Sequence, residues 1–95
     1  MITAIVMINA APDAIPEAAQ AIAELDGISE VYSVAGNFDL IAVVRVKAYD
    51  EVADVIAGRL GKVPGVRSTE THVAFRAYSR HDLEAAFALG FDDAG

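Results

Sequence analysis

The 95-residue chain has the size of a single domain, and its 55% of hydrophobic residues is high for a monomer with so small a core. Charged residues interrupt every long apolar run after the first dozen positions, which excludes a membrane-spanning helix of about 20 residues. The net charge is −7 and no Lys or Arg precedes Arg45, so the chain lacks the basic face that nucleic-acid binding needs. We therefore expect a homo-oligomer with no membrane contact and no direct contact with nucleic acid.

The sequence contains no cysteine, so disulfides, thiolate metal sites and a cysteine nucleophile are excluded. Its start, MITAIVMINAAP, lacks the positively charged region that opens a signal peptide, and we expect the protein in the cytoplasm. No residue pattern points to a cofactor, and none is expected.

The first part of the chain predicts a strand, a helix and a second strand. Residues 3–11 form an apolar, β-branched run that divides into two faces, as in a strand. A break at Pro12-Asp13 opens a helix with apolar residues at steps of three and four. These residues are Ile15, Ala18, Ala19, Ile22 and Leu25. Gly27 is suited to end this helix in the left-handed conformation, and residues 28–35 predict the second strand.

The second part predicts the same elements again. Gly36-Asn37 is typical of a short hairpin turn, and residues 38–46 predict a third strand. This strand is apolar on both faces as far as Val44, which predicts a central strand covered on both sides. Asp50 is expected to cap a second helix that ends at Pro64-Gly65. The buried stripe of this helix consists of Val52, Val55, Ile56 and Leu60. Residues 66–78 predict a fourth strand. A short last helix then holds Leu83, Ala86 and Phe87, with Ser79 or Asp82 as its cap.

The chain repeats itself at a constant offset of 38 positions. Ile22, Leu25, Gly27, Ile28 and Val31 correspond to Leu60, Val63, Gly65, Val66 and Thr69. Each half is strand, helix, strand, which predicts an α+β fold: a ferredoxin-like βαββαβ domain with a four-stranded antiparallel sheet and two helices on one face. Two helices cannot cover both faces of four apolar strands, so we expect a sheet-to-sheet dimer. Residues 1–78 form this domain, and residues 79–95 form a C-terminal helical extension and tail.

Three motifs in this order resemble the effector (RAM) domain of the leucine-responsive/asparagine-regulator (Lrp/AsnC) family over about residues 2–77. They are the turn Gly36-Asn37-Phe38-Asp39, the helix end Leu60-Gly61-Lys62-Val63-Pro64-Gly65-Val66, and Thr69-Glu70-Thr71 in the fourth strand. The resemblance implies a non-catalytic domain of transcription regulation that binds a free amino acid. It also implies dimers that assemble further, to an octamer or a similar ring, with the ligand held between dimers.

Members of this family usually carry an N-terminal helix-turn-helix that binds DNA. This sequence begins directly at the first strand, and it therefore resembles a stand-alone version of the effector domain. Such a domain is expected to act with a full-length DNA-binding relative as a partner, by co-assembly.

The resemblance implies ligand-binding roles for Gly36, Asn37, Phe38, Asp39, Thr69 and Thr71. The Asp39 carboxylate is suited to the ammonium group of an amino acid, and the N–H groups of Gly36 and Asn37 are suited to its carboxylate. Thr69 and Thr71 share a strand face and add hydroxyl groups, which in this family can come from a neighbouring subunit. The alternative is that Asp39 only satisfies amides of the turn and that both threonines are ordinary strand residues.

A metal or a catalytic triad is less well supported by the residues. Glu70 and His72 share a strand face and His81-Asp82 follow, but no third ligand has a helpful spacing, so no metal is expected. Ser79, His81 and Asp82 lie too close along the chain to form a catalytic relay.

Two other kinds of protein share this topology. Small dimeric α/β-barrel monooxygenases need a deep pocket with a few polar groups, whereas this sequence has no Trp and a plainly aliphatic third strand. Amino-acid-binding domains of the ACT type have a Gly-rich turn before the first helix, where this sequence has residues 9–13, NAAPD. Both alternatives rank below the Lrp/AsnC-type domain, with the monooxygenase type as the main one.

Overall fold

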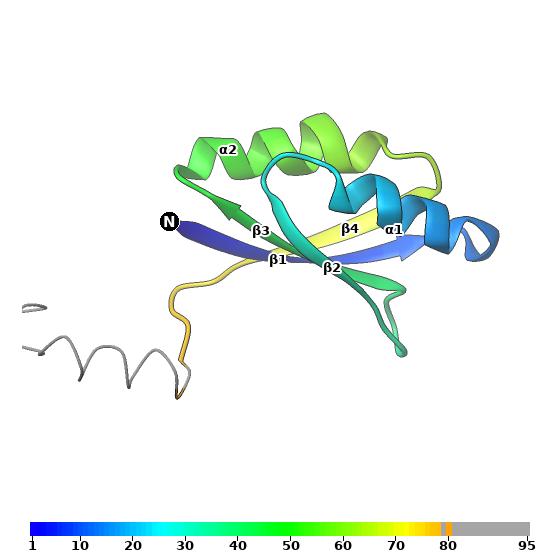
Figure 1. The fold of residues 1–95 in the computed structure, drawn as a ribbon, viewed down its shortest axis with the longest axis horizontal. Coiled ribbons are helices and arrows are strands. Elements are labelled where there is room, and N and C mark those ends of the chain that lie inside the picture. Colours follow the sequence, from blue (N-terminus) through cyan, green and yellow to red (C-terminus); the bar gives the residue numbers. More distant parts are fainter. Residues whose placement is uncertain (79, 81–95) are drawn as a thin grey trace, which may run out of the picture.

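A computed structural model describes residues 1–78 and 80 and contains one four-stranded antiparallel sheet in the order β2-β3-β1-β4 (Figure 1). The strands are β1 (Ile2–Ala10), β2 (Ile28–Ser33), β3 (Leu40–Val46) and β4 (Val66–Val73). This arrangement confirms the predicted α+β, ferredoxin-like fold class. The fourth strand is shorter than expected and ends at Val73, not at Tyr78. The predicted short last helix lies outside the described residues.

Two helical segments lie together on one face of the sheet (Figure 1). The first consists of a 3₁₀ turn, η1 (Pro12–Ala14), followed by α1 (Ile15–Ala23). The second consists of α2 (Tyr49–Ala53), a π-helical stretch η2 (Asp54–Arg59) and a 3₁₀ turn η3 (Leu60–Lys62). Among the described residues, no helix is long and apolar enough to cross a bilayer.

The core lies between this helical layer and the sheet. Alternate residues of the two central strands are fully or almost fully buried, namely Ala4, Val6, Ile8 and Ala10 on β1 and Leu40, Ala42, Val44 and Val46 on β3. From the helices, Ile22, Val55 and Leu60 pack onto them. Val55 and Leu60 are five residues apart, and both face the sheet because a π-helical turn brings such residues into line.

The opposite face of the sheet is covered by no described element, and we call it the open face (Figure 1). Its apolar centre consists of Ile5, Met7, Ile41 and Val43, which are paired across β1 and β3. Ile5 is 37% exposed and the other three are half-buried. The third strand was predicted to be covered on both sides; within the described residues it is covered only on the helix side.

The internal repeat is visible in the geometry of the fold. Ile2 pairs with Val46 and Ile8 pairs with Leu40. The offset of 38 positions carries Ile2 to Leu40 and Ile8 to Val46, so the two central strands exchange places under an approximate twofold axis. That axis passes through the central pair of the register, and both halves therefore build the core in the same way.

Gly27 and Gly65 are equivalent in this repeat, and both have a positive φ, at 93° and 94°. A Cβ atom on Gly27 would lie 2.7 Å from Cγ2 of Val55, and one on Gly65 would lie 2.8 Å from Cβ of Ala14. Each glycine thus ends the helical segment of its own half against the helical segment of the other half. The prediction of a left-handed helix end at Gly27 is confirmed.

Two local predictions were wrong. The link between β2 and β3 is a six-residue loop, 34–39, and not a two-residue hairpin turn; the N–H of Val34 donates to the carbonyl of Asp39 at 3.0 Å. The second helix is capped by Glu51 and not by Asp50. The Glu51 carboxylate accepts hydrogen bonds from the N–H groups of Lys47 at 2.7 Å and Ala48 at 3.0 Å. Asp50 already lies within the first helical turn, from where it cannot take the N-cap position.

Candidate functional site

The loop between β2 and β3 brings together four of the predicted ligand-binding residues, from Gly36 to Asp39. Gly36 has a φ of 128° and, like Asn37, is exposed, whereas Phe38 and Asp39 are half-buried. No hydrogen bond joins the N–H groups of Gly36, Asn37 or Phe38 to other described residues. The loop therefore presents free backbone donors next to a carboxylate at one end of the sheet.

Asp39 ties this loop to the end of β1. Its Oδ2 atom accepts a hydrogen bond from the N–H of Ala10 at 2.9 Å, and its own N–H donates to the carbonyl of Ile8 at 2.9 Å. The pairing of β1 with β3 ends at Ile8 and Leu40, whereas Ala10 still pairs with Val66 of β4; the carboxylate therefore replaces the partner that Ala10 lacks on the β3 side. This structural role differs from the alternative given by the sequence, because the N–H that the carboxylate accepts belongs to β1 and not to the turn of Asp39. The other oxygen, Oδ1, makes no hydrogen bond within the described residues.

Thr69 and Thr71 lie apart from this loop. On β4 they pair with Ile8 and Val6, whose side chains are on the helix face, and both threonines are exposed at the outer edge of the sheet. The strand β1 lies between β4 and β3, and neighbouring strands are about 4.8 Å apart, so about 10 Å separates Thr69 from the position of Leu40. Within one chain, the two groups of predicted residues do not form a single contact site.

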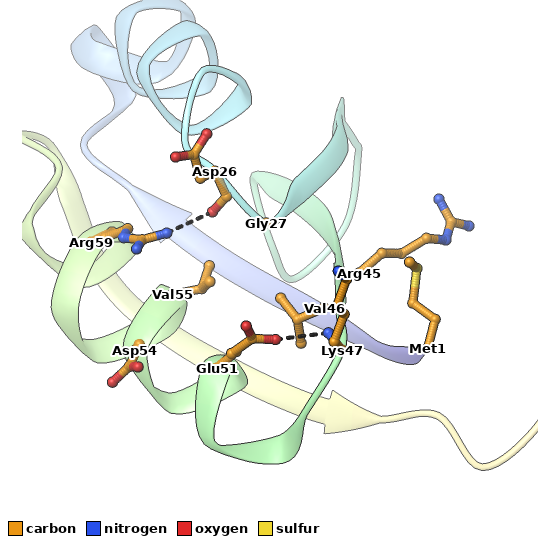
Figure 2. Close-up of a pocket in the computed structure, with 10 residues that line it drawn as sticks. All are labelled: Met1, Asp26, Gly27, Arg45, Val46, Lys47, Glu51, Asp54, Val55 and Arg59. Carbon is orange, nitrogen blue, oxygen red and sulfur yellow. Dashed lines mark hydrogen bonds between the residues drawn. The ribbon is translucent and has the colours of Figure 1, made fainter.

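A hollow of about 450 Å³ lies at the other end of β3 (Figure 2). It is lined by Met1, Asp26, Gly27, Arg45, Val46, Lys47, Glu51, Asp54, Val55 and Arg59. Figure 2 shows Arg59 turned toward the Asp26 carbonyl, to which its Nη1 donates at 3.0 Å. None of the predicted ligand-binding residues lines this hollow. Its charged walls differ from the enclosed apolar pocket that a monooxygenase-type function requires.

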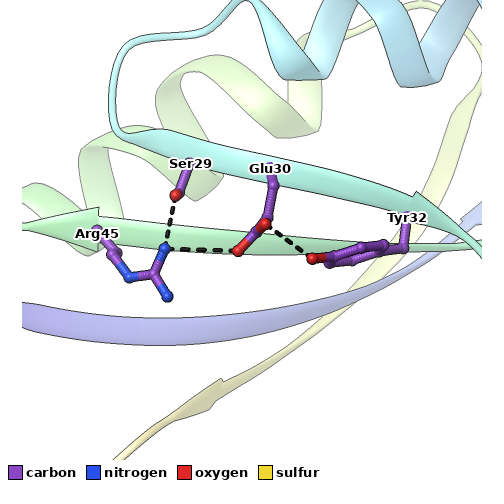
Figure 3. Close-up of polar contacts among 4 residues, drawn as sticks. All are labelled: Ser29, Glu30, Tyr32 and Arg45. Atoms are coloured by element: carbon purple, nitrogen blue, oxygen red, sulfur yellow. Dashed lines mark hydrogen bonds and ion pairs between the residues drawn. The ribbon is translucent and has the colours of Figure 1, made fainter. Parts of the chain in front are cut away.

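A polar cluster on the edge of the open face was missed by sequence reasoning (Figure 3). Nη1 of Arg45 donates to Oγ of Ser29 at 2.6 Å and lies 3.5 Å from Oε1 of Glu30, while the Tyr32 hydroxyl donates to Oε2 of Glu30 at 2.7 Å. This hydrogen bond, and then the negative charge of Glu30, raise the pKa of Tyr32 above its ordinary value. The spacing of two residues between Glu30 and Tyr32 was the signal in the sequence, because it places both on one strand face.

The other edge of the open face carries Glu70 and His72, with Oε2 and Nε2 2.7 Å apart. These two side chains share a strand face, as the sequence predicted. Within the described residues, no group of three His, Asp or Glu side chains comes together in a way that would hold a metal ion. His81 and Asp82, which were considered with them, lie outside the described residues. The open face thus has an apolar centre and a polar pair or cluster at both edges.

The structure is thus a small ferredoxin-like α+β domain with an exposed loop and a half-buried carboxylate at one end of its sheet. Residues 3–83 match the Lrp/AsnC ligand-binding domain, and the chain belongs to this family. The crystal structure of TTHA0845 from Thermus thermophilus is similar, with a TM-score of 0.79 and 46% identity, covering 84% of this chain and 100% of that one. The family prediction is confirmed.

Two curated relatives are transcriptional regulators by name. An uncharacterized helix-turn-helix-type regulator of Pyrococcus furiosus is 37% identical over 77% of this chain and 51% of its own length. The leucine-responsive regulatory protein of Haemophilus influenzae is 33% identical over 77% of this chain and 44% of its own length. The chain thus spans about half the length of the curated relatives it matches. The family and these relatives give the domain a regulatory, effector-binding role.

Proposed function

We propose that this chain is a non-catalytic domain that binds a free amino acid at the loop 36–39 and changes its assembly or its partner contacts in response. The observation that carries the proposal is the state of Asp39. One of its carboxylate oxygens is committed to Ala10, and the other has no hydrogen bond within the described residues beside an exposed loop with free N–H groups.

The chemistry of an amino acid fits this arrangement. Its ammonium group would pair with Oδ1 of Asp39, and its carboxylate would accept hydrogen bonds from the N–H groups of Gly36 and Asn37. Phe38 lies in the same loop and would contact the ligand side chain. The name of the Haemophilus influenzae relative describes that protein as leucine-responsive, which supports an amino acid as the class of ligand.

Assembly is part of the same proposal. The open face would pair with that of a second copy and bury Ile5, Met7, Ile41 and Val43, because an apolar sheet centre is stabilised when it is removed from water. Since Thr69 and Thr71 lie apart from Asp39 within one chain, they would reach the ligand from a neighbouring dimer in an octamer or a similar ring. A longer DNA-binding relative with the same domain could join such a ring, in the cytoplasm.

The test is thermal unfolding of the protein with each of the twenty amino acids, on wild type and on Asp39→Asn. An asparagine keeps an oxygen for the N–H of Ala10 and removes the charge that pairs with ammonium. A ligand that binds only the folded protein adds about 2.7 kcal/mol at a hundredfold excess over its Kd. We expect one or a few amino acids to raise the Tm of wild type and of the control Asp50→Asn, but not of Asp39→Asn. If the same amino acid raised the Tm of Asp39→Asn as much as that of wild type, Asp39 would not be part of the ligand site.

A further inference from the structure

The chain leaves the sheet after β4 through an exit segment, residues 74–78. The N–H of Ala74 donates to the carbonyl of Thr3 at 2.9 Å, and the following residues run away from the sheet on the side opposite the helices (Figure 1). Phe75 is 96% exposed and Tyr78 is 80% exposed. Two bulky aromatic side chains on one short segment are unusual unless something covers them.

A hollow of about 580 Å³ lies between the exit segment and the open face. It is lined by Met1, Thr3, Ile5, Val43, Arg45, Ala74, Phe75, Arg76 and Ala77. Its apolar wall comes from Ile5 and Val43 at the centre of the sheet, and Phe75 stands at its rim. A projecting aromatic side chain and an apolar hollow are therefore next to each other on one surface.

We propose that two copies of this chain exchange their exit segments, so that Phe75 of each copy enters the hollow of the other. A dimer related by a twofold axis needs a surface that is complementary to itself, and a projection beside a matching hollow meets this requirement. The hollow is continuous with the apolar centre of the open face, so the exchange adds to the sheet-to-sheet contact. The inference rests on the proposed dimer and names the segment that completes it.

The charges of the chain also fit a second copy as the occupant. The described part of the stretch 74–80 contains two arginines, Arg76 and Arg80, both exposed, and no Asp or Glu. The whole chain has a net charge of −7, and Glu30 and Glu70 stand at the two edges of the open face. The attraction acts between this basic, aromatic segment and the acidic body of another copy as a whole, and it weakens with salt. Among the described residues, the hollow itself is lined by Arg45 and Arg76 and by no carboxylate, so the contact inside the hollow comes from the apolar side chain of Phe75.

The first test uses Phe75→Trp in the full chain, which has no Trp of its own, so that all tryptophan fluorescence comes from this position. Fluorescence and sedimentation are followed on the same dilution series. We expect short-wavelength emission from the dimer, and a shift to the emission of exposed tryptophan as the dimer dissociates. Exposed-type emission from an intact dimer would overturn the exchange while leaving the sheet-to-sheet dimer in place.

Two further outcomes also decide against the proposal. Short-wavelength emission from a monomer would show that residues of the same chain cover the side chain at position 75. A monomer with exposed-type emission at every concentration would overturn both the exchange and the sheet-to-sheet dimer.

The second test is Phe75→Ala, with Tyr49→Ala as the matched control. Tyr49 is also an exposed aromatic residue, at 63%, but it begins α2 on the helix side. We expect Phe75→Ala to raise the Kd of the dimer by about tenfold or more, because an aromatic side chain that fills a pocket of the partner is a common hot spot, and Tyr49→Ala to leave it unchanged. Equal Kd values for wild type and Phe75→Ala would contradict the exchange.

Discussion

The carboxylate of Asp39 accepts a 2.9 Å hydrogen bond from the backbone N–H of Ala10, and this contact fixes the β2–β3 loop to the end of the central strand β1. The residue that is proposed to bind the ligand therefore also holds the fold together. A ligand on the second carboxylate oxygen would act on a side chain that is already held in place by the sheet. Such a loop is ordered before the ligand arrives, which reduces the entropy lost on binding.

This double role predicts different effects for two substitutions of Asp39. Asp39→Ala leaves the half-buried N–H of Ala10 without a partner, and we expect a loss of about 1–3 kcal/mol in the free energy of unfolding. Asp39→Asn keeps an acceptor and should lose less than half as much. Urea unfolding of both variants measures the difference. Equal losses would show that the negative charge, and not the acceptor atom, holds the loop.

A side chain at Gly27 or Gly65 is predicted to destabilise the fold. In Gly27→Ala and Gly65→Ala the new Cβ would lie within 2.7 Å of Val55 and 2.8 Å of Ala14, at a φ that L-residues rarely adopt. We expect each variant to lose about 1–3 kcal/mol of stability, measured by chemical unfolding. Gly58→Ala is the control, because it lies in a helical segment with open space around it, and it should be neutral or slightly stabilising. If Gly27→Ala were as stable as the wild type, the backbone at this helix end could shift enough to accept the new Cβ, which would contradict the prediction.

The start of the second helix depends on Glu51. Its carboxylate accepts the N–H groups of Lys47 and Ala48, so Glu51→Ala leaves two donors at the helix start without a partner. We expect a loss of about 0.5–2 kcal/mol, measured by thermal unfolding. Asp50→Ala, one position earlier, should change stability by only a few tenths of a kcal/mol. The reverse order of effects would restore Asp50 as the cap.

Tyr32 is predicted to ionise at higher pH than an ordinary tyrosine. Its hydroxyl donates to Glu30, and loss of the proton would break this bond and place two negative charges together. The folded protein holds this proton more tightly than the unfolded chain, so the stabilising contribution is present below the ordinary pKa of 10.0 and is lost as the pH rises through the raised pKa.

The difference between the tyrosinate absorbance titrations of wild type and Tyr32→Phe isolates this residue. We expect its midpoint above the ordinary value, and a return toward that value in Glu30→Gln. A midpoint that Glu30→Gln does not move would show that the contact with Glu30 does not persist in solution.

The fold could be predicted from the sequence because it depends on local periodicity and on a repeat. The alternation in β1, the apolar steps in α1 and the pair Gly27 and Gly65 each determine an element from neighbouring residues alone. The details that were wrong depend on the exact conformation of two short segments, in which Glu51 and Val34 make their hydrogen bonds with residues only three to five positions away. The capping carboxylate was placed one residue too early, and the loop after β2 is longer than its Gly-Asn pair suggested.

The candidate site could be predicted only in part, because it depends on contacts between residues that are far apart in the sequence. The hydrogen bond from Ala10 joins residues 29 positions apart, and nothing in the local pattern VAGNFDL specifies it. The distance between Asp39 and Thr69 follows from the strand order, because β1 separates their strands. A contact between the loop 36–39 of one subunit and Thr69 of another depends on how the subunits assemble, and the sequence of one chain does not determine this.

The measurement that tests the central claim most directly is native mass spectrometry of the protein with and without each of the twenty amino acids. The proposed function predicts that one or a few amino acids add their mass to an assembly of two or more dimers and leave the monomer and the isolated dimer unchanged in mass. If no amino acid binds any species, or if one binds the isolated monomer or the isolated dimer, the proposed site between dimers is contradicted.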